Sequence, residues 1–211
     1  AVGEKSKPKP ASNVIQSRNG TISVPKEFVI ERVAASPLVK YPMMGNFDDQ
    51  GRLYIAASSG MNLRTADLEK ELPNFVQRLE DTNGDGKFDK ATVFADKMTL
   101  PMGALWYRGS VYVASPPNIW KLTDLDDDGV ADKREILVDK FGYSGNAASV
   151  HGPFLGPTGR IYWCDGRHGH EFKDEDGKVT SQGLASRIFS MRPDGSDVQV
   201  HCGGGMDNPN P

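Results

Sequence analysis

Apolar and polar residues alternate in short runs that recur along the chain. Three of these runs follow a turn glycine and align with one another, at Gly51–Ala56, Gly109–Ala114 and Gly159–Cys164. Alternation of this kind after a glycine predicts half-buried β-strands that begin at a tight turn. Each aligned run follows another short apolar run, at Met43–Phe47, Met102–Trp106 and Gly152–Leu155. These pairs predict repeated β-hairpins and therefore an all-β fold.

Two further strand-like runs follow each pair and complete a repeat. Third strands are predicted at Phe75–Leu79, Ile119–Leu122 and Ile188–Met191, and fourth strands at Ala91–Phe94, Glu135–Val138 and Asp197–Val200. Four short strands in about 50 residues match the size of one β-propeller blade. We therefore expect residues 27–211 to form about three four-stranded blades, the N-terminal part of a propeller of about six blades. A two-sheet sandwich would explain the strands but not their grouping in fours.

Composition agrees with many short strands and sets the N-terminal segment apart. The 211 residues include 23 Gly and 14 Pro, which favours turns over long helices. Residues 1–26 are polar, with Lys and Pro near their start, and are expected to form an extended linker. The net charge is −3 and no Lys/Arg run stands out, so no nucleic-acid partner is expected. No apolar run reaches the length of about 18 residues that a membrane span needs, and no signal peptide is visible.

Two acidic loops separate the predicted third and fourth strands of the first two repeats. Residues 81–89 and 124–132 both fit the pattern D-x-[DN]-x-D-G-x-x-D. Oxygen atoms at positions 1, 3, 5 and 9 and the carbonyl at position 7 can converge on one calcium ion, and the glycine at position 6 permits the sharp turn. The predicted ligands are Asp81, Asn83, Asp85, Lys87 and Asp89 in the first loop, and Asp124, Asp126, Asp128, Val130 and Asp132 in the second.

Each loop is therefore expected to hold one structural Ca2+ ion, giving two sites, while a solvated acidic turn is the alternative. Glu135 would complete an EF-hand pattern in the second loop. The residues that flank this loop lack a helical period, however, so a β-hairpin loop is expected instead. Both loops resemble the calcium loops in the propellers of integrin α-subunits, where the ion is structural.

The stretch Ser149–Tyr162, with His151 followed by Gly156-Pro157-Thr158-Gly159-Arg160-Ile161-Tyr162, resembles the signature of glucose/sorbosone dehydrogenases, which are soluble quinoprotein propellers. Residues 28–211 are also similar to a domain of large secreted proteins from planctomycetes, described as membrane-bound dehydrogenases. Proteins of that group often carry a c-type haem domain. No C-x-x-C-H motif occurs here, so haem is expected only on a domain that is not in this sequence.

The resemblance implies a sugar or alcohol dehydrogenase that uses pyrroloquinoline quinone (PQQ). His151 would be the general base, Asp165 would orient it, and Asn208 would contact the cofactor. A c-type haem domain or cytochrome would accept the electrons. Asp207 stands where the family has an arginine, which replaces a cation by an anion next to an anionic quinone. The alternative is a calcium-stabilised propeller without enzymatic activity that binds a carbohydrate or a protein.

Further histidines and two cysteines leave several roles open. His168 and His170, together with His151, His201 and Cys202, are predicted to form a polar loop, a substrate-facing loop or a transition-metal site. Cys164 and Cys202 can be free thiols or a disulfide, and the sequence does not decide between them. The calcium loops and the family resemblance together imply a periplasmic or extracellular location, or one in the cell envelope.

Overall fold

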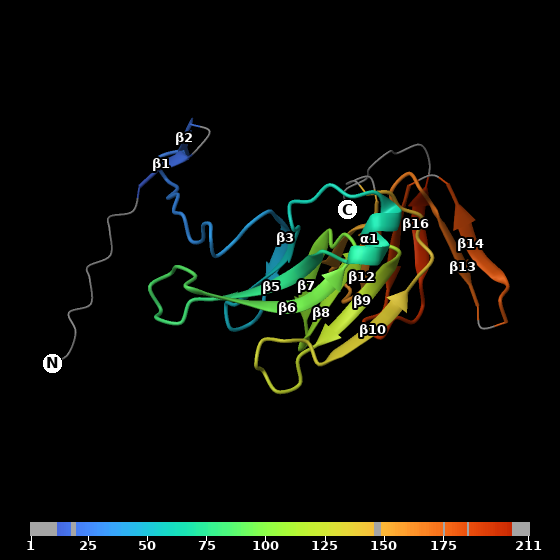
Figure 1. Ribbon diagram of the computed structural model, residues 1–211. Helices are drawn as coiled ribbons and strands as arrows, with labels where there is room; N and C mark the ends of the chain where they lie inside the picture. Colours follow the sequence, from blue (N-terminus) through green and yellow to red (C-terminus); the bar gives the residue numbers. More distant parts are fainter. Residues whose placement is uncertain (1–11, 18–19, 146–148, 175, 185, 204–211) are drawn as a thin grey trace.

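The computed structural model describes residues 12–17, 20–145, 149–174, 176–184 and 186–203. Within these ranges the chain forms three four-stranded antiparallel sheets, two additional β-hairpins and one short helix (Figure 1). The prediction of an all-β fold with about three propeller blades is confirmed. The single helix in the described part, α1 (Thr65–Glu71), has 7 residues, and no described helix is long and apolar enough to cross a membrane.

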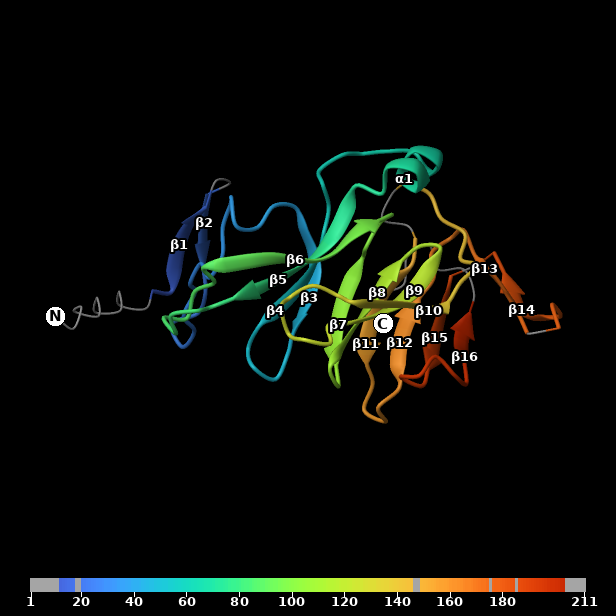
Figure 2. The ribbon, with the colours of Figure 1, turned by 60° about the horizontal axis from the view of Figure 1, so that its bottom comes forward.

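Each sheet is one blade, built from four strands. Blade 1 contains β3 (Pro42–Phe47), β4 (Leu53–Ala57), β5 (Asn74–Glu80) and β6 (Lys90–Met98). Blade 2 contains β7 (Gly103–Tyr107), β8 (Ser110–Ser115), β9 (Asn118–Thr123) and β10 (Lys133–Val138). Blade 3 contains β11 (His151–Leu155), β12 (Ile161–Cys164), β15 (Arg187–Met191) and β16 (Gln199–Gly203). Figure 2 shows the three sheets side by side in chain order.

The first strand of each blade lies at the inner edge, where neighbouring blades meet. Strand β7 contacts both β3 and β11. A side chain at Gly103 in β7 would collide with the Gly152 carbonyl of β11, and one at Gly45 in β3 would collide with the Tyr54 carbonyl. Strands β7 and β11 can therefore approach closely between blades, and β3 can approach β4 within blade 1, because glycine has no side chain at these points.

Two apolar layers fill the spaces between the blades. Between blades 1 and 2 the buried side chains include Val76, Phe94, Val111 and Leu122. Between blades 2 and 3 the layer is aromatic, and Trp163 stacks on Phe189 with ring centroids 5.6 Å apart. These layers fix the orientation of each blade and hence the positions of the loops at both ends.

Three segments add elements that the repeat pattern does not predict. Helix α1 lies between the second and third strands of blade 1, and the hairpin β13 (His170–Lys173) with β14 (Val179–Gly183) lies at the same place in blade 3. A short hairpin, β1 (Val14–Ser17) with β2 (Gly20–Ser23), forms within the segment expected to be an extended linker. β-Branched Ile15 and Ile22 face each other in this hairpin, which gives it strand-forming character.

The last strand of blade 3 begins later than predicted. Strand β16 spans Gln199–Gly203, whereas the sequence pattern predicted a strand at residues 197–200. Asp197 adopts a left-handed backbone conformation (φ 55°), and its carboxylate bonds to Arg160 Nη1 at 2.8 Å and to the Gln199 side chain. Asp197 therefore belongs to the turn, and His201 and Cys202 lie inside the strand.

Candidate functional site

The strand order separates two sets of loops at opposite ends of the blades. The acidic loops, residues 81–89 and 124–132, join the third and fourth strands of blades 1 and 2. We call this end of the blades the acidic end. His151, Asp165 and His170 lie at the opposite end, the histidine end, which also carries α1. In Figure 1 the acidic loops project from the blades on the side away from α1.

The two acidic loops have the same internal hydrogen bonds. The carboxylate at position 1 accepts the N–H of the position 6 glycine, and the carboxylate at position 9 accepts the N–H of position 2. The four pairs are Asp81–Gly86 (2.8 Å), Asp124–Gly129 (2.9 Å), Asp89–Thr82 (3.1 Å) and Asp132–Leu125 (2.7 Å). The position 7 amides of Lys87 and Val130 donate to the position 5 carboxylates at 2.9 and 2.8 Å. Equivalent positions therefore have equivalent local conformations.

The second loop brings three carboxylates together. One oxygen from each of Asp124, Asp126 and Asp128 lies within 4.8 Å of the others. The Asp124 side chain is only 8% exposed, and its Oδ1 atom is buried without a hydrogen-bond partner. A buried, unpaired carboxylate oxygen is costly unless a cation satisfies it. The described residues of this loop therefore fit a hard cation such as Ca2+.

The acidic side chains of the first loop are directed towards groups of the loop itself. Position 3 is Asn83, whose Oδ1 accepts the N–H of Asp85 at 2.9 Å. Asp89 is turned towards Thr82 and the Asn83 amide, and Asp81 accepts three backbone N–H groups. Among the residues that the structure describes, three acidic groups do not converge in this loop. Backbone N–H groups, chiefly that of Gly86, lower the pKa of Asp81, which keeps it ionised for a cation.

The second loop is also tied to blade 1 through a buried arginine. Arg78 on β5 is 2% exposed, and its Nη1 lies 3.2 Å from Asp124 Oδ2 and 3.3 Å from Asp127 Oδ1. Its Nη2 pairs with Glu80 at 3.2 Å. Arg52 reaches the same Asp127 oxygen at 2.5 Å, and this hydrogen bond lowers the pKa of Asp127. The ion pairs of Asp124 and Asp127 therefore join the second loop to the interface between blades 1 and 2.

At the histidine end, His151 begins the inner strand β11 and is buried. Its Nδ1 lies 2.9 Å from the Ser149 carbonyl, which can only accept a hydrogen bond. The proton therefore sits on Nδ1, and Nε2 is the acceptor. Burial lowers the pKa of His151 below its ordinary value, so the neutral imidazole prevails near neutral pH. A neutral histidine with a free acceptor nitrogen is suited to take up a proton.

Asp165 follows β12 and makes its hydrogen bonds elsewhere. Its Oδ2 lies 2.9 Å from His170 Nδ1, and its Oδ1 accepts the N–H of Arg187 at 2.5 Å. Among the described residues, no hydrogen bond joins Asp165 to His151. The carboxylate assigned by resemblance to His151 thus orients His170. The Nε2 atom of His170 lies 2.8 Å from Ser181 Oγ, a partner that no sequence spacing indicated.

The remaining histidines and cysteines do not gather at one point. His201 bonds to Ser190 Oγ at 2.7 Å and stacks on Tyr162. Cys164 and Cys202 do not form a disulfide. They lie on either side of Ile188, two strand spacings apart and beyond the Cα separation of about 7 Å that a disulfide tolerates. Burial raises the pKa of Cys164 to about 12. Asn208, expected to contact a cofactor, lies outside the described residues.

Comparison with known proteins adds a family and two structures of similar fold. The family model described as "Domain of unknown function (DUF7133)" matches residues 15–207. No curated protein matches the sequence. A chain of the nidogen/laminin complex is 16% identical with a TM-score of 0.57, over 93% of this chain and 59% of that one. The PQQ-bound aldose sugar dehydrogenase from Streptomyces coelicolor is 14% identical with a TM-score of 0.40, over 76% and 43%. The chain thus spans less than two thirds of either structure.

Proposed function

Because this chain belongs to the DUF7133 family and forms part of a β-propeller, we propose that it is a calcium-binding propeller module of a secreted or cell-envelope protein. The observation that carries the proposal is the buried, unpaired Oδ1 of Asp124 beside the carboxylates of Asp126 and Asp128. Calcium is bound by six to eight oxygen atoms at about 2.3–2.6 Å, from carboxylates, carbonyls and water. Both acidic loops offer such atoms at matching positions.

The two sites should differ in strength. Position 3 is Asp126 in the second loop and neutral Asn83 in the first. Affinity for calcium increases with the number of charged ligands and with the rigidity of the loop. The ion pairs of Arg78 and Arg52 hold the second loop against blade 1, and the first loop has no such ion pairs in the described residues. The second loop should therefore bind calcium more tightly.

The role of the ion in this proposal is structural. Bound calcium would neutralise three crowded carboxylates and fix the loop that meets blade 1. Extracellular calcium modules bind with dissociation constants of about 0.1–1 mM, which suits a periplasmic or extracellular location. The histidine end would then be free to bind a small polar ligand such as a sugar or another alcohol.

Isothermal titration calorimetry of the chelator-treated protein tests this proposal. Two binding events for calcium are expected, and the tighter should weaken in Asp126→Asn, which gives the second loop the neutral residue that the first loop has at position 3. Asp126 is exposed and, among the described residues, accepts a single hydrogen bond, from the Asp128 N–H at 3.3 Å, so the variant should fold normally. Magnesium should compete weakly, because it demands a smaller and more regular cage. Absence of heat from calcium in the wild-type protein would refute the proposal.

A second candidate function is oxidation of a sugar or alcohol, as the dehydrogenase resemblance implies. The observation that favours it is His151, whose Nδ1 is held by the Ser149 carbonyl and whose Nε2 can accept the hydroxyl proton. PQQ, when bound, would supply the hydride acceptor. His151 fits the proton-accepting role. Asn208, which the resemblance matches to a cofactor contact, lies outside the described residues. Dye-linked oxidation of aldoses and alcohols with added PQQ, lost in His151→Gln, tests this activity, and oxidation that persists in His151→Gln would exclude His151 as the base.

A further inference from the structure

The hairpin β13–β14 and the end of β12 together hold a chain of three hydrogen-bonded side chains that neither proposed function uses. Asp165 Oδ2 lies 2.9 Å from His170 Nδ1, and His170 Nε2 lies 2.8 Å from Ser181 Oγ. We infer that Ser181 is the nucleophile of an esterase-type site, activated by His170, oriented by Asp165 and acting on esters of short apolar acids. A nucleophile, a base within hydrogen-bond reach and a group that orients the base are together the geometric signature of such sites.

The protonation pattern follows from the partners. Asp165 is an acceptor when ionised, and the Arg187 N–H donates to its other oxygen, which stabilises the carboxylate. The Nδ1 of His170 therefore donates to Asp165, and Nε2 faces the Ser181 hydroxyl as an acceptor. The side chains of Asp165 and His170 are both 0% exposed, so their hydrogen bond is shielded from water and strengthened by the low local dielectric.

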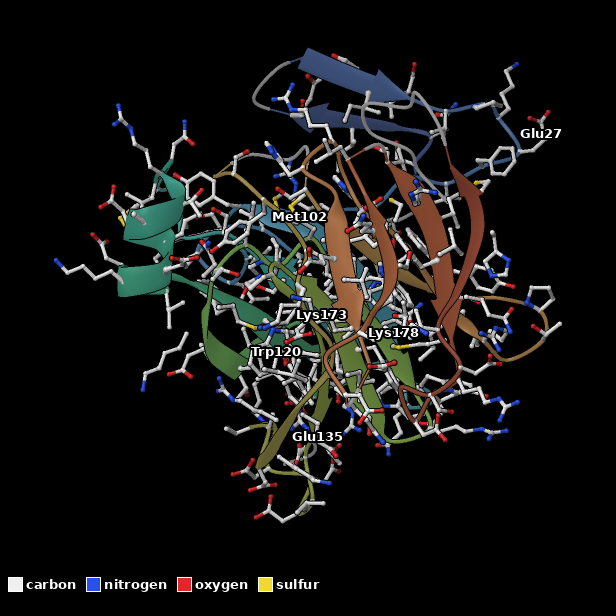
Figure 3. The ribbon with its side chains drawn as sticks, turned by 90° about the vertical axis from the view of Figure 1, so that its right-hand side faces the viewer. Glu27, Met102, Trp120, Glu135, Lys173 and Lys178 are labelled. Carbon is white, nitrogen blue, oxygen red and sulfur yellow. The ribbon has the colours of Figure 1, made fainter. Side chains whose placement is uncertain are left out.

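The hairpin geometry explains why Ser181 lies where a nucleophile must. Phe172 pairs with Ser181, but Lys173 pairs with Val179, so Thr180 is an extra residue in β14. Such a bulge bends the strand and re-aims side chains, and bulges are frequent next to active sites. Thr180 and Ser181, although adjacent in sequence, both line the same pocket as a result. Figure 3 views the molecule from the side of this hairpin, which the labels of Lys173 and Lys178 mark.

The pocket beside Ser181 has the walls that an acyl chain needs. It is a cavity of ≈ 310 Å³ between the hairpin, the end of β10 and the start of β16. This volume lies at the lower end of the range of about 300–1,000 Å³ for small-molecule sites, which favours a short chain. Its apolar lining comes from Leu137, Val138, Phe172, Val198 and Val200. Its polar lining comes from Asp139, Lys173, Thr180 and Ser181, and of these we assign the hydroxyls of Thr180 and Ser181 to the ester.

The proposed reaction balances with water as the co-reactant. Ser181 Oγ attacks the ester carbonyl carbon, its proton passes to His170 Nε2, and the carbonyl electron pair moves to the oxygen. The Thr180 hydroxyl, which now donates to the Phe172 carbonyl over a long 3.3 Å, is the donor that we assign to this oxygen. The C–O bond to the alcohol then breaks, and the alcohol takes the proton from His170. Water repeats both steps and releases the acid and Ser181.

Labelling of the whole chain with a fluorophosphonate probe, followed by peptide mass spectrometry, tests this inference. Covalent attachment at Ser181 is expected, together with hydrolysis of p-nitrophenyl butyrate. Ser190 is an internal control, since its Oγ also bonds to a histidine, His201, at 2.7 Å, but no described carboxylate bonds to that histidine. Ser190 should stay unlabelled. If the native protein shows no label on Ser181, the inference is overturned, and Asp165–His170–Ser181 only secures the hairpin.

Variants then separate the roles of the three side chains. Ser181→Ala should remove the label, and Ser181→Ala or His170→Asn should lower kcat by at least about 10³-fold. Thr180→Ala should lower kcat by about 10²–10³-fold without preventing the label, as expected for loss of one oxyanion donor. Esterase activity that persists in Ser181→Ala would contradict the assignment, and far-ultraviolet circular dichroism establishes that each variant is folded.

Discussion

Replacement of Asp124 by asparagine should destabilise the chain in two separable ways. Asp124 Oδ2 pairs with Arg78 at 3.2 Å inside the interface between blades 1 and 2, while Oδ1 is the atom assigned to calcium. Removing one partner of a buried ion pair costs about 3–5 kcal/mol. Arg78 keeps Glu80 and Asp127 as partners, so the lower end of that range, about 3 kcal/mol, is expected. Since 1 kcal/mol shifts Tm by about 2–4 °C in a domain of this size, the loss is about 6–12 °C.

This first effect should not depend on calcium, whereas the second should. At a calcium concentration 100 times the dissociation constant, binding adds about 2.7 kcal/mol, or about 5–11 °C. The matched control is Asp126→Asn, which removes the charge of a predicted ligand that has no ion pair with Arg78. In excess chelator, Asp126→Asn should melt within about 2 °C of the wild type, because exposed substitutions usually change stability by less than about 0.5 kcal/mol. In the same chelator, Asp124→Asn should have a Tm well below that of the wild type.

Differential scanning calorimetry of the three proteins, each with calcium and with chelator, measures both effects. In chelator, the wild type and Asp126→Asn should have nearly the same Tm, and Asp124→Asn should have a lower Tm. In calcium the wild type should gain more stability than either variant. Equal melting of the two variants in chelator would refute the role given to Arg78, and a wild-type Tm unaffected by chelator would refute the structural role of calcium.

Three further predictions concern other parts of the molecule. Burial lowers the pKa of His151 below the ordinary 6.5, so the unfolded chain binds the proton first as the pH falls. The contribution of neutral His151 to the free energy of unfolding should be fully present above pH 6.5 and be lost as the pH drops through the folded-state pKa. In urea titrations between pH 7 and 5, His151→Gln should weaken this dependence of stability on pH. Gly103→Ala should cost about 1–3 kcal/mol by forcing β7 away from the Gly152 carbonyl, and an unchanged urea midpoint would contradict this packing. A thiol reagent should modify exposed Cys202 and spare Cys164 until the chain unfolds, whereas two fast-reacting thiols would contradict the burial of Cys164.

The blades could be predicted from the sequence because their signals are local. A glycine at a tight turn followed by alternating residues, as in Gly109–Ala114, depends only on neighbouring residues, and each of the twelve blade strands overlaps a run predicted from the sequence. The pattern of the acidic loops is equally local, since it is fixed by five positions within a stretch of nine residues. The fourth strand of blade 3 was misplaced because Asp197 prefers the turn, where Arg160 pairs with it.

Contacts between distant segments could not be predicted in this way. The partner of Asp165 is decided by the β13–β14 hairpin, which brings His170 and Ser181 into line. Nothing in the spacing of Ser181 distinguishes it from other polar strand residues. Likewise, the sequence pattern predicts only that Arg78 lies in a strand. Its ion pair with Asp124 in the second loop depends on the packing of blade 1 against blade 2.

Anomalous diffraction from a crystal grown in calcium is the decisive test of calcium binding, because it locates the ion. Peaks are expected within both acidic loops, each surrounded by oxygen atoms at about 2.3–2.6 Å, with Asp124, Asp126 and Asp128 among the ligands of the stronger peak. Calcium-saturated crystals in which neither loop carries a peak would contradict calcium binding by these loops.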